Sequence, residues 1–394
     1  MLYEEIAAIV SIDNHCHLPL HQKPPTTVQG LARHFTEADD PKVLAEQTPH
    51  SLFFRRAIRD LATLLGIEAD ESAVTPAEFA QTVLASRATY ADQDWFKLTV
   101  EKANVSVILA DTGYPRTGGW TVGEANQILT TLQPPVQVKE VLRLERVLED
   151  LILTSASFEI CEEAFRQTIR EARSKGIVGF KSIIAYRTGL RVQATQSQSD
   201  ASSVFKRLKV ETEEKGDYVR VADKALLDYL LVVALEEAAK EELPVQFHTG
   251  FGDTDVSLEE ANPVLLKPLL ENRKLRNAPV IFLHCYPYLK EASYLASVYP
   301  HVYFDTSLTS PLVAFGGGRA WEDALGLAPS TKVMFGSDAW GIPDIIYLGS
   351  LHTRLALSKL LINWIKDGWM GQREALEIAN NVLHDNAQRL YGLL

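Results

Sequence analysis

The sequence predicts a single (β/α)8 barrel, the TIM-barrel fold, over residues 1–394. Eight short runs rich in β-branched and aromatic residues recur along the chain, and a stretch with helical periodicity separates most neighbouring runs. Strands that alternate with helices form parallel βαβ units, and eight such units close into a barrel. The hydrophobic content of 46% in 394 residues is enough to bury the large core that this fold requires.

Each predicted strand is a short apolar run with a high content of residues that favour β-structure. The eight runs cover residues 9–18, 105–113, 136–144, 177–186, 244–250, 279–287, 301–308 and 332–340. The clearest helix between them spans 222–243, where Leu227 and Leu230 share one face and acidic residues lie on the other. Residues 350–367 follow the same pattern, and the gap between the sixth and seventh runs holds little more than one helix.

Two segments are longer than a single helical connection requires, and both follow the carboxyl end of a predicted strand. Residues 19–98 contain an amphipathic stripe that includes Phe54 and Ile58, so we expect a helical insertion there. Residues 191–218 begin with a Gln- and Ser-rich run, and we expect a polar loop. Active sites of barrels form at the carboxyl ends of strands, so either insertion could serve as a lid. Packing decoration and a contact between copies in a homo-oligomer are the alternatives.

The composition argues against several classes of partner. The net charge of −12 is unfavourable for binding nucleic acid or an anionic membrane surface. The three cysteines are far apart in the sequence, which is typical of a protein from a reducing compartment. The first residues carry no basic flank, and the most apolar run, 226–235, is too short to span a bilayer. We therefore expect a cytoplasmic protein that acts on a small molecule.

Histidine and other polar side chains gather at the ends of the predicted strands. His15 and His17 stand two residues apart at the end of the first strand, so their side chains share one face. Taken alone, such a pair is more often two histidines at a strand edge or cap than a metal site. The ends of the fourth, fifth, sixth and eighth strands carry Lys181, His248, His284 and Asp338. Because the carboxyl ends of barrel strands meet at one mouth, these nitrogen and oxygen donors predict a catalytic metal site.

Several motifs at these positions resemble those of the amidohydrolase superfamily, and within it the amidohydrolase 2 group. They are HCH on the first predicted strand, FHTG on the fifth, LHCY on the sixth and GSDAW on the eighth. The carboxyl-terminal LHDNAQRLYGL is similar to the usual ending of that group. More narrowly, SLFFRRAIRDL and GFKSIIAYRTGL are similar to the amidohydrolase domain of FluG-type proteins. The resemblance extends over the whole chain and implies a barrel that hosts many different reactions.

The resemblance implies a role for each of these side chains. His15, His17, His248 and Asp338 would bind a divalent metal ion, with Zn²⁺ as the first candidate and Fe²⁺ or Mn²⁺ as alternatives. The ion lowers the pKa of a bound water from about 15.7 to about 7, and Asp338 would pass a proton from that water to the leaving group. His284 would bind a second ion or polarise the group under attack. Taken alone, Asp338 is better explained as a cap at a strand end.

Lys181 determines whether one ion or two is expected. In dinuclear members of the superfamily a lysine at the end of the fourth strand carries a carbamate that bridges two ions, and Lys181 occupies that position. With His248 and His284 on the second ion, the set of ligands is complete for two. Many relatives in the amidohydrolase 2 group use a single ion, and an unmodified Lys181 could instead bind substrate or a nearby acid.

Arg187 and Arg143 are the candidate substrate-binding residues. Each stands near the end of a predicted strand, where a guanidinium group would pair with a substrate carboxylate. A structural ion pair with one of the chain's acids explains them equally well. The leading prediction is a metal-dependent amidohydrolase that cleaves a C–N, amide-type bond in a small carboxylated substrate. The alternatives are a decarboxylase or uronate-type isomerase on the same scaffold, and a catalytically silent binding or scaffold protein.

Overall fold

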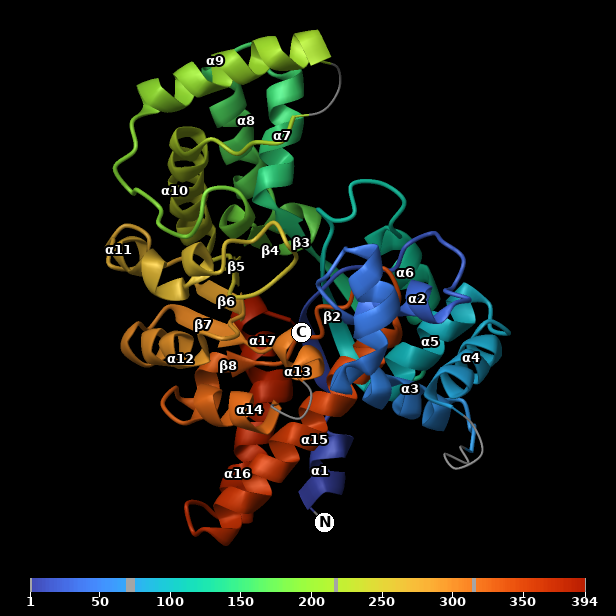
Figure 1. Cartoon of the computed structure of the whole chain (residues 1–394). Helices are drawn as coiled ribbons and strands as arrows, with labels where there is room; N and C mark the ends of the chain where they lie inside the picture. The colour runs from blue at the N-terminus through green and yellow to red at the C-terminus, as the bar shows by residue number, and fades with distance from the viewer. Residues whose placement is uncertain (1, 69–74, 216–218, 314–316, 394) are drawn as a thin grey trace.

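The computed structural model describes residues 2–68, 75–215, 219–313 and 317–393, and these residues form a (β/α)8 barrel (Figure 1). The eight strands are parallel, and neighbours in the sheet follow the order of the chain. They are β1 (Ser11–Cys16), β2 (Val105–Asp111), β3 (Gln137–Arg143), β4 (Ile177–Ser182), β5 (Val245–Thr249), β6 (Val280–His284), β7 (Val302–Asp305) and β8 (Val333–Met334). Each strand lies inside its predicted range, so the predicted fold class is confirmed.

Helices connect the strands and surround the barrel. They are α1 (Leu2–Ala8), α2 (Val28–Ala32), α3 (Leu52–Leu64), α4 (Pro76–Arg87), α5 (Asp92–Ala103), α6 (Val122–Leu129), α7 (Leu144–Thr154), α8 (Phe158–Arg170), α9 (Gln198–Lys215), α10 (Lys224–Glu241), α11 (Lys267–Leu270), α12 (Leu289–Val298), α13 (Thr309–Leu312), α14 (Gly317–Leu325), α15 (Asp344–Lys366), α16 (Gln372–Asn380) and α17 (Asn386–Tyr391). The two long predicted helices correspond to α10 and α15, and α12 is the single helix between β6 and β7.

By length and composition, α15 is the one helix in the described ranges that is apolar enough to cross a membrane. Its most apolar window is 67% buried inside the protein. Such burial is typical of a helix that packs in a protein core.

The barrel closes through contacts between β1 and the chain that follows β8. The Asp338 amide donates a hydrogen bond to the His15 carbonyl at 2.8 Å. The buried Asp13 carboxylate accepts hydrogen bonds from the Ser337 amide at 2.8 Å and from the Ser337 hydroxyl at 2.5 Å. These bonds join the first and last strands of the sheet, although 324 residues separate Asp13 from Ser337 in the sequence.

Apolar side chains fill the barrel interior. One interior cluster consists of Ile12, Leu109, Val141, Ile281, Leu283, Met334, Ala387, Tyr391 and Leu393. Tyr391, on α17, also has a polar contact, because its hydroxyl accepts a hydrogen bond from the Gln246 side chain at 2.7 Å. Helix α17 therefore reaches into the barrel as far as a polar residue of β5.

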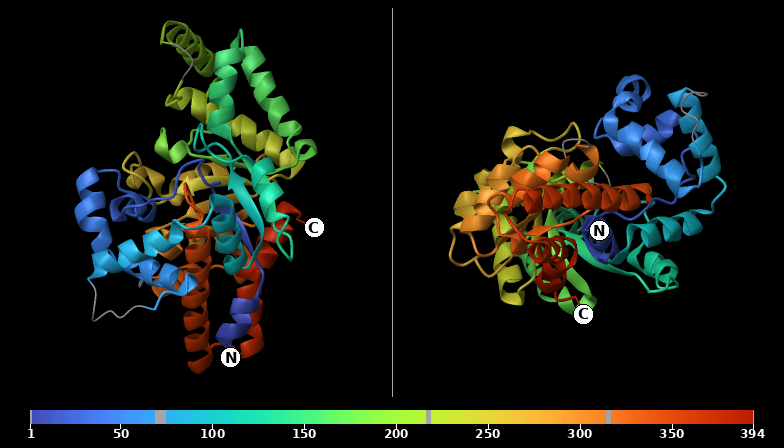
Figure 2. Two further views of the ribbon diagram at one scale, coloured as in Figure 1. Left: turned by 90° about the vertical axis from the view of Figure 1, so that its right-hand side faces the viewer. Right: turned by 90° about the horizontal axis from the view of Figure 1, so that it is seen from below.

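The first insertion forms a lobe of helices beside the barrel (Figure 2). Residues 19–98 contain α2, α3, α4 and the start of α5, and residues 69–74 lie outside the described part of the chain. Aromatic side chains such as Phe53 are buried in an apolar core shared by the lobe and the barrel. Arg87, on α4, donates hydrogen bonds of 2.8 and 2.7 Å to Asp344 at the start of α15, and both residues are buried. This ion pair joins the lobe to the barrel.

The second insertion is largely helical, and the prediction of a polar loop over 191–218 is wrong where α9 forms. The buried face of α9 includes Ala201, Phe205 and Leu208. This face packs against α7, α8 and α10, and α9 runs across their ends (Figure 1). The Ser197 hydroxyl accepts a hydrogen bond from the Asp200 amide at 3.1 Å, so part of the Gln- and Ser-rich run caps the helix. Residues 216–218 lie outside the described part of the chain.

Candidate active site

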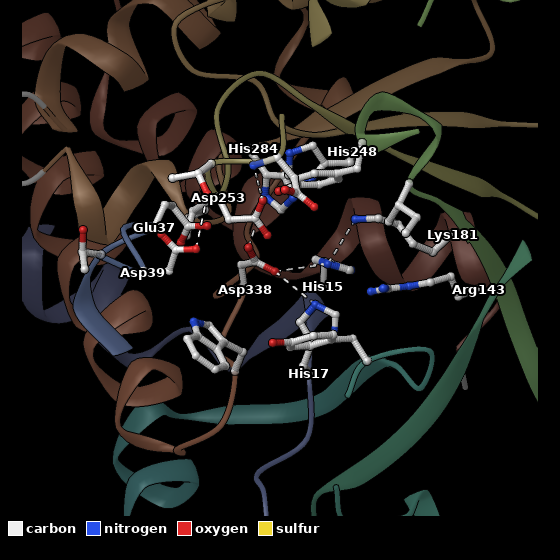
Figure 3. Close-up of a pocket in the computed structure, with 18 of the residues that line it drawn as sticks. His15, His17, Glu37, Asp39, Arg143, Lys181, His248, Asp253, His284 and Asp338 are labelled. Atoms are coloured by element: carbon white, nitrogen blue, oxygen red, sulfur yellow. Dashed lines mark hydrogen bonds and ion pairs between the residues drawn. The ribbon is translucent and has the colours of Figure 1, made fainter. Parts of the chain in front are cut away.

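A cavity of about 430 Å³ opens at the carboxyl ends of the strands (Figure 3). The predicted site residues that line it are His15, His17, Arg143, Lys181, Arg187, His248, His284 and Asp338. The structure therefore brings together every site residue that was predicted from the sequence. Their convergence follows from the parallel barrel, in which the carboxyl ends of all strands face the same way.

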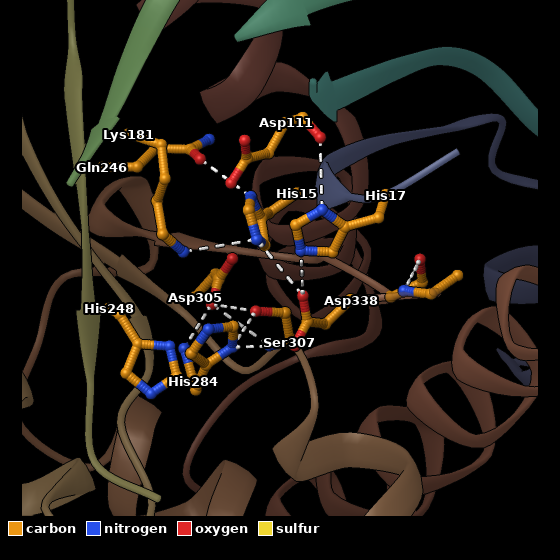
Figure 4. A network of polar contacts seen from close by, with 12 residues as sticks. His15, His17, Asp111, Lys181, Gln246, His248, His284, Asp305, Ser307 and Asp338 are labelled. Atoms are coloured by element: carbon orange, nitrogen blue, oxygen red, sulfur yellow. Dashed lines mark hydrogen bonds and ion pairs between the residues drawn. The ribbon is translucent and has the colours of Figure 1, made fainter. Parts of the chain in front are cut away.

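The two β1 histidines, His15 within the strand and His17 directly after it, are oriented by hydrogen bonds at their Nδ1 atoms (Figure 4). His15 Nδ1 donates to the Gln246 side-chain oxygen at 2.9 Å. His17 Nδ1 donates to the backbone carbonyl of Asp111 at 3.2 Å. The Nε2 atoms of both rings lie near Asp338 Oδ1, at 3.2 Å for His15 and 3.7 Å for His17. An imidazole that donates through one nitrogen presents the lone pair of the other, which is the usual arrangement of metal-binding histidines.

His284 and Asp338 face each other in the cavity, with His284 Nδ1 at 3.6 Å from Asp338 Oδ2. The Ser307 hydroxyl lies 2.9 Å from His284 Nδ1 and donates to the buried Asp305 carboxylate at 2.7 Å. His284 has a φ of 68° and Asp338 a φ of 50°, a left-handed conformation that is strained for residues other than glycine. The strained backbone occurs where these two side chains enter the cavity.

Lys181 and His248 occupy the part of the cavity formed by β4 and β5. Lys181 is almost fully buried, and its Nζ lies 3.3 Å from His15 Nε2. The His248 ring contacts the rings of Tyr186 and His284, with centroid distances of 4.4 and 4.5 Å. Lys181 thus contacts His15 directly, whereas His248 contacts His284.

Arg143 lines the cavity and is held by Asp111, the last residue of β2. Arg143 Nη2 donates to Asp111 Oδ2 at 2.6 Å, and Arg143 Nε donates to the same oxygen at 3.0 Å. A Cβ atom at Gly113 would lie 2.3 Å from Arg143 Cβ, so this packing requires glycine. Arg187 pairs with the buried Glu149 at 3.2 Å. Both candidate substrate-binding arginines therefore lie at the cavity and also form an ion pair within the protein.

Burial controls the ionisation of the site. It lowers the pKa of His15, His248 and His284 well below the usual range, and the positive charge of Lys181 acts in the same direction. Burial also raises the pKa of Asp338 and lowers that of Lys181 to about 8. The three imidazoles are therefore neutral at pH 7, which is the form that binds metal ions.

Two groups of donor atoms lie close enough together to hold a metal ion. One group consists of His15, His284 and Asp338, and the other consists of His15, His17 and Asp111. Within each group the donor atoms lie within 4.8 Å of one another. Imidazole and carboxylate donors without a thiolate suit a catalytic divalent ion. The residues present thus fit the expected metal, and Asp111 is an additional candidate ligand.

The polar residues of the site that were not identified from the sequence include Asp111, Tyr186, Glu37 and Asp253. Asp111 ends β2 in the way that His284 ends β6, so the search for polar residues at strand ends could have found it. Tyr186, Glu37 and Asp253 lie outside the strands, where no periodic pattern indicates their position.

The first insertion covers part of the cavity. The residues of this insertion that line it are Arg33, Thr36, Glu37, Ala38 and Asp39. The His34 ring packs against Trp340 with a centroid distance of 4.7 Å, so this segment lies over the chain that follows β8. No described residue between 191 and 215 lines the cavity. Of the two insertions, it is therefore the first that lies over the cavity, and its residues 33–39 are called the lid segment below.

Comparisons with known proteins identify relatives of this chain. A model of the amidohydrolase family matches residues 160–393. Protein fluG from Emericella nidulans is 34% identical over 224 residues, which is 55% of this chain. The match covers 26% of protein fluG, so this chain corresponds to about a quarter of that relative's length.

Solved structures with the same fold were also found. A protein from Lactobacillus casei ATCC 334, provisionally described as a metal-dependent hydrolase, matches with a TM-score of 0.84 and 28% identity. That match covers 99% of this chain and 97% of the other. Uronate isomerase from Thermotoga maritima matches with a TM-score of 0.64 and 12% identity, over 99% of this chain and 96% of the isomerase. The second match shows a shared barrel fold.

Proposed function

Because the chain belongs to the amidohydrolase family, we propose that it is a metal-dependent hydrolase that cleaves a C–N, amide-type bond in a small carboxylated substrate. The observation that carries this proposal is the convergence of the β1 histidines, His284 and Asp338 on one cavity of the barrel. The same proposal places the protein in the cytoplasm, with a small molecule as its partner.

The proposed metal ligands are His15, His17, His248 and Asp338, and two of them, His15 and Asp338, belong with His284 to one of the two compact donor groups. When bound, a divalent ion supplies Lewis acidity and lowers the pKa of a water molecule to about 7. Zn²⁺ is the first candidate, and Fe²⁺ and Mn²⁺ are the alternatives. His15 and His17 present Nε2 because Gln246 and the Asp111 carbonyl already engage their Nδ1 atoms.

Asp338 is the proposed proton-transfer residue. Its Oδ1 faces the β1 histidines and its Oδ2 faces His284. Burial raises the pKa of this carboxyl, so it accepts a proton more readily than an exposed aspartate does. A proton accepted at Asp338 from the attacking water would pass to the leaving nitrogen. Because the Ser307 hydroxyl donates to Asp305, the neutral His284 ring donates its Nδ1–H to Ser307, and its Nε2 lone pair would be left to bind a second ion.

Arg143 is the first candidate for holding the substrate carboxylate. Asp111 engages Nε and Nη2 of Arg143, which fixes the guanidinium plane and leaves Nη1 for the substrate. A hydrogen bond to a charged group contributes about 1.5–3 kcal/mol. Arg187, which Glu149 holds in the same cavity, is the second candidate.

A uronate-type isomerase is the alternative reaction, because uronate isomerases share the fold over nearly the whole chain. Isomerisation leaves the mass of the substrate unchanged, whereas hydrolysis adds one water and yields two products. Decarboxylation releases CO₂. Mass spectrometry of the products therefore separates the three reactions.

Metal analysis and a substrate screen test the proposal. We expect a bound divalent metal ion and turnover within a set of amides, lactones and carboxylated sugar acids.

His15→Ala and His17→Ala should lose both metal and activity. Asp338→Asn should retain part of the metal and lose about 100-fold or more in kcat, the usual contribution of a proton-transfer residue. His50→Ala, which removes an exposed histidine of the lobe, is the matched control. Normal metal content and activity in all three site variants would refute the assignment.

A further inference from the structure

Charged side chains divide the cavity into two sides (Figure 3). One side carries Glu37, Asp39 and Asp253. Arg143 and Lys181 lie on the opposite side. His15 and Asp338 lie between the two sides, so the proposed reacting centre separates a side lined by acidic residues from a side lined by basic residues.

The acidic side is built from two segments that are far apart in the sequence. Glu37 belongs to the lid segment, and Asp253 belongs to the loop after β5. The Asp39 carboxylate accepts a hydrogen bond from the Thr254 hydroxyl at 3.4 Å, which joins the two segments. Glu37 is partly buried and lines the cavity, and within the described residues it has no hydrogen bond or ion pair.

The carboxyl groups of this side repel one another. Burial, followed by the negative charges of Asp338 and Asp253, raises the pKa of Glu37 to about 8. Burial, followed by the charges of Asp255 and Asp39, raises the pKa of Asp253, and the positive charge of Arg220 partly opposes this rise. A positively charged group placed among these carboxyls would relieve the repulsion and would gain charge-assisted hydrogen bonds.

Two arginines also line the cavity near these acids. Arg220 pairs with Asp255 at 3.2 Å, and Arg33 is exposed to solvent. Among the described residues, neither arginine forms an ion pair with Glu37. A cation that binds beside Glu37 would therefore have to come from a ligand.

We propose that the substrate is a zwitterion, with its carboxylate beside Arg143 and an ammonium group between Glu37 and Asp253. The bond to be cleaved then lies between the two charges, next to Asp338. This inference rests on the proposed hydrolysis of a carboxylated substrate and adds the charge at the other end of that substrate. Two charged ends held at opposite sides would align an extended molecule across the reacting centre.

ω-Amino acids test this binding mode without a bond to hydrolyse. ε-Aminocaproate carries both charges, hexanoate lacks the ammonium group, and hexylamine lacks the carboxylate. With metal-loaded protein in isothermal titration calorimetry, we expect the best ω-amino acid to bind about tenfold more tightly than either singly charged analogue of its length. A series from γ-aminobutyrate to ε-aminocaproate, with the matching acids and amines, measures the spacing of the two charges.

Two variants locate the ammonium group. Glu37→Gln and Asp253→Asn should each weaken binding of the ω-amino acid about tenfold and leave binding of the simple acid unchanged. Asparagine at position 253 keeps the oxygen that accepts a hydrogen bond from the Asp255 amide at 3.0 Å, so the loop should hold its shape. Glu46→Gln removes an exposed carboxylate of the same insertion and should change neither affinity. Circular dichroism verifies that each variant is folded.

Equal affinity for acids with and without the ammonium group, throughout the series, would overturn the proposal. An unchanged preference in both folded variants would overturn it as well. Loss of metal from Glu37→Gln would show that the acidic side holds an inorganic cation, and the zwitterion proposal would then be wrong. The proposed hydrolysis is tested separately, because the titrations require no turnover: a failed amide screen with an intact ω-amino acid preference would reject the reaction and retain the binding mode.

Discussion

The orientation of His15 and His17 depends on residues that do not face the substrate. Gln246 holds His15, and Tyr391 in turn holds Gln246 with its hydroxyl group. The backbone of Asp111 holds His17. Contacts of this kind commonly change metal affinity by about 10- to 100-fold. The β1 histidines are therefore positioned by the packing of the whole barrel interior and not by β1 alone.

Lys181 is expected to determine how many metal ions bind. Burial lowers its pKa to about 8, which favours the neutral amine that forms a carbamate with CO₂. If that carbamate bridges two ions, Lys181→Ala should lose about one metal equivalent per chain, and short carboxylic acids should partly restore it. Metal analysis measures the loss, and a high-resolution structure of the loaded protein shows any added group on Nζ.

The matched control for this experiment is Lys175→Ala. Lys175 is exposed and pairs with Glu171 at 2.8 Å, outside the cavity, so its removal should leave the metal content unchanged. A bare amine on Lys181, together with full metal content in Lys181→Ala, would contradict a bridging carbamate.

At the level of whole elements, the position of the lobe depends on the start of α15. Asp344 accepts hydrogen bonds from Arg87 on α4 and from the Trp95 ring nitrogen on α5, the latter at 3.0 Å. All three residues are buried. Because the lid segment belongs to the same insertion, this cluster also helps to place the residues that cover the cavity.

Asp344→Ala should weaken the attachment of the lobe to the barrel and lower the unfolding free energy of the protein. The change leaves the Arg87 charge buried without its partner, which costs about 3–5 kcal/mol of unfolding free energy. Urea denaturation measures the loss. Asp367→Ala, at the exposed end of the same helix, should change the unfolding free energy by no more than about 0.5 kcal/mol. Similar losses in the two variants would show that the ion pair contributes no special stability.

In the molecule as a whole, three of the proposed metal ligands connect the first and last strands of the sheet. His15 belongs to the first strand, His17 directly follows it, and Asp338 follows the last strand. The sheet closes at the same place through the buried contact between Asp13 and Ser337. A metal ion held by these ligands would therefore add a second link between the first and last strands of the barrel.

Removal of the metal should lower the stability of the entire barrel. A ligand that binds only the folded state, at a free concentration 100-fold above its Kd, contributes about 2.7 kcal/mol. Treatment with a chelator should therefore lower the melting temperature, and added Zn²⁺ or Mn²⁺ should restore it. His15→Ala should melt at the same temperature with and without chelator. An equal melting temperature for loaded and chelated parent protein would contradict a metal held between the first and last strands.

Much of the fold and many of the site residues could be predicted because they follow from local patterns. A short apolar run rich in β-branched and aromatic residues favours a strand whatever its position in the chain, and each of the eight runs contains a strand. The side chains of His15 and His17 share a face because residues two apart in a strand do so. Parallel strands then carry His284 and Asp338 to the same mouth, although the sequence separates them widely from His15.

The tertiary structure alone decided which segments meet at that mouth. The pairing of Arg143 with Asp111, the position of Glu37 on the same side of the cavity as Asp253, and the packing of α9 all join segments whose contact no local pattern indicates. Periodicity specifies which face of a helix or strand is apolar. It does not distinguish the possible positions of a charged residue outside the strands, because the neighbouring sequence is the same whether that residue lines a cavity, faces solvent or forms an ion pair. Its partner is chosen by the packing of the whole chain, because burial and the charges of distant segments determine the free energy of each pairing.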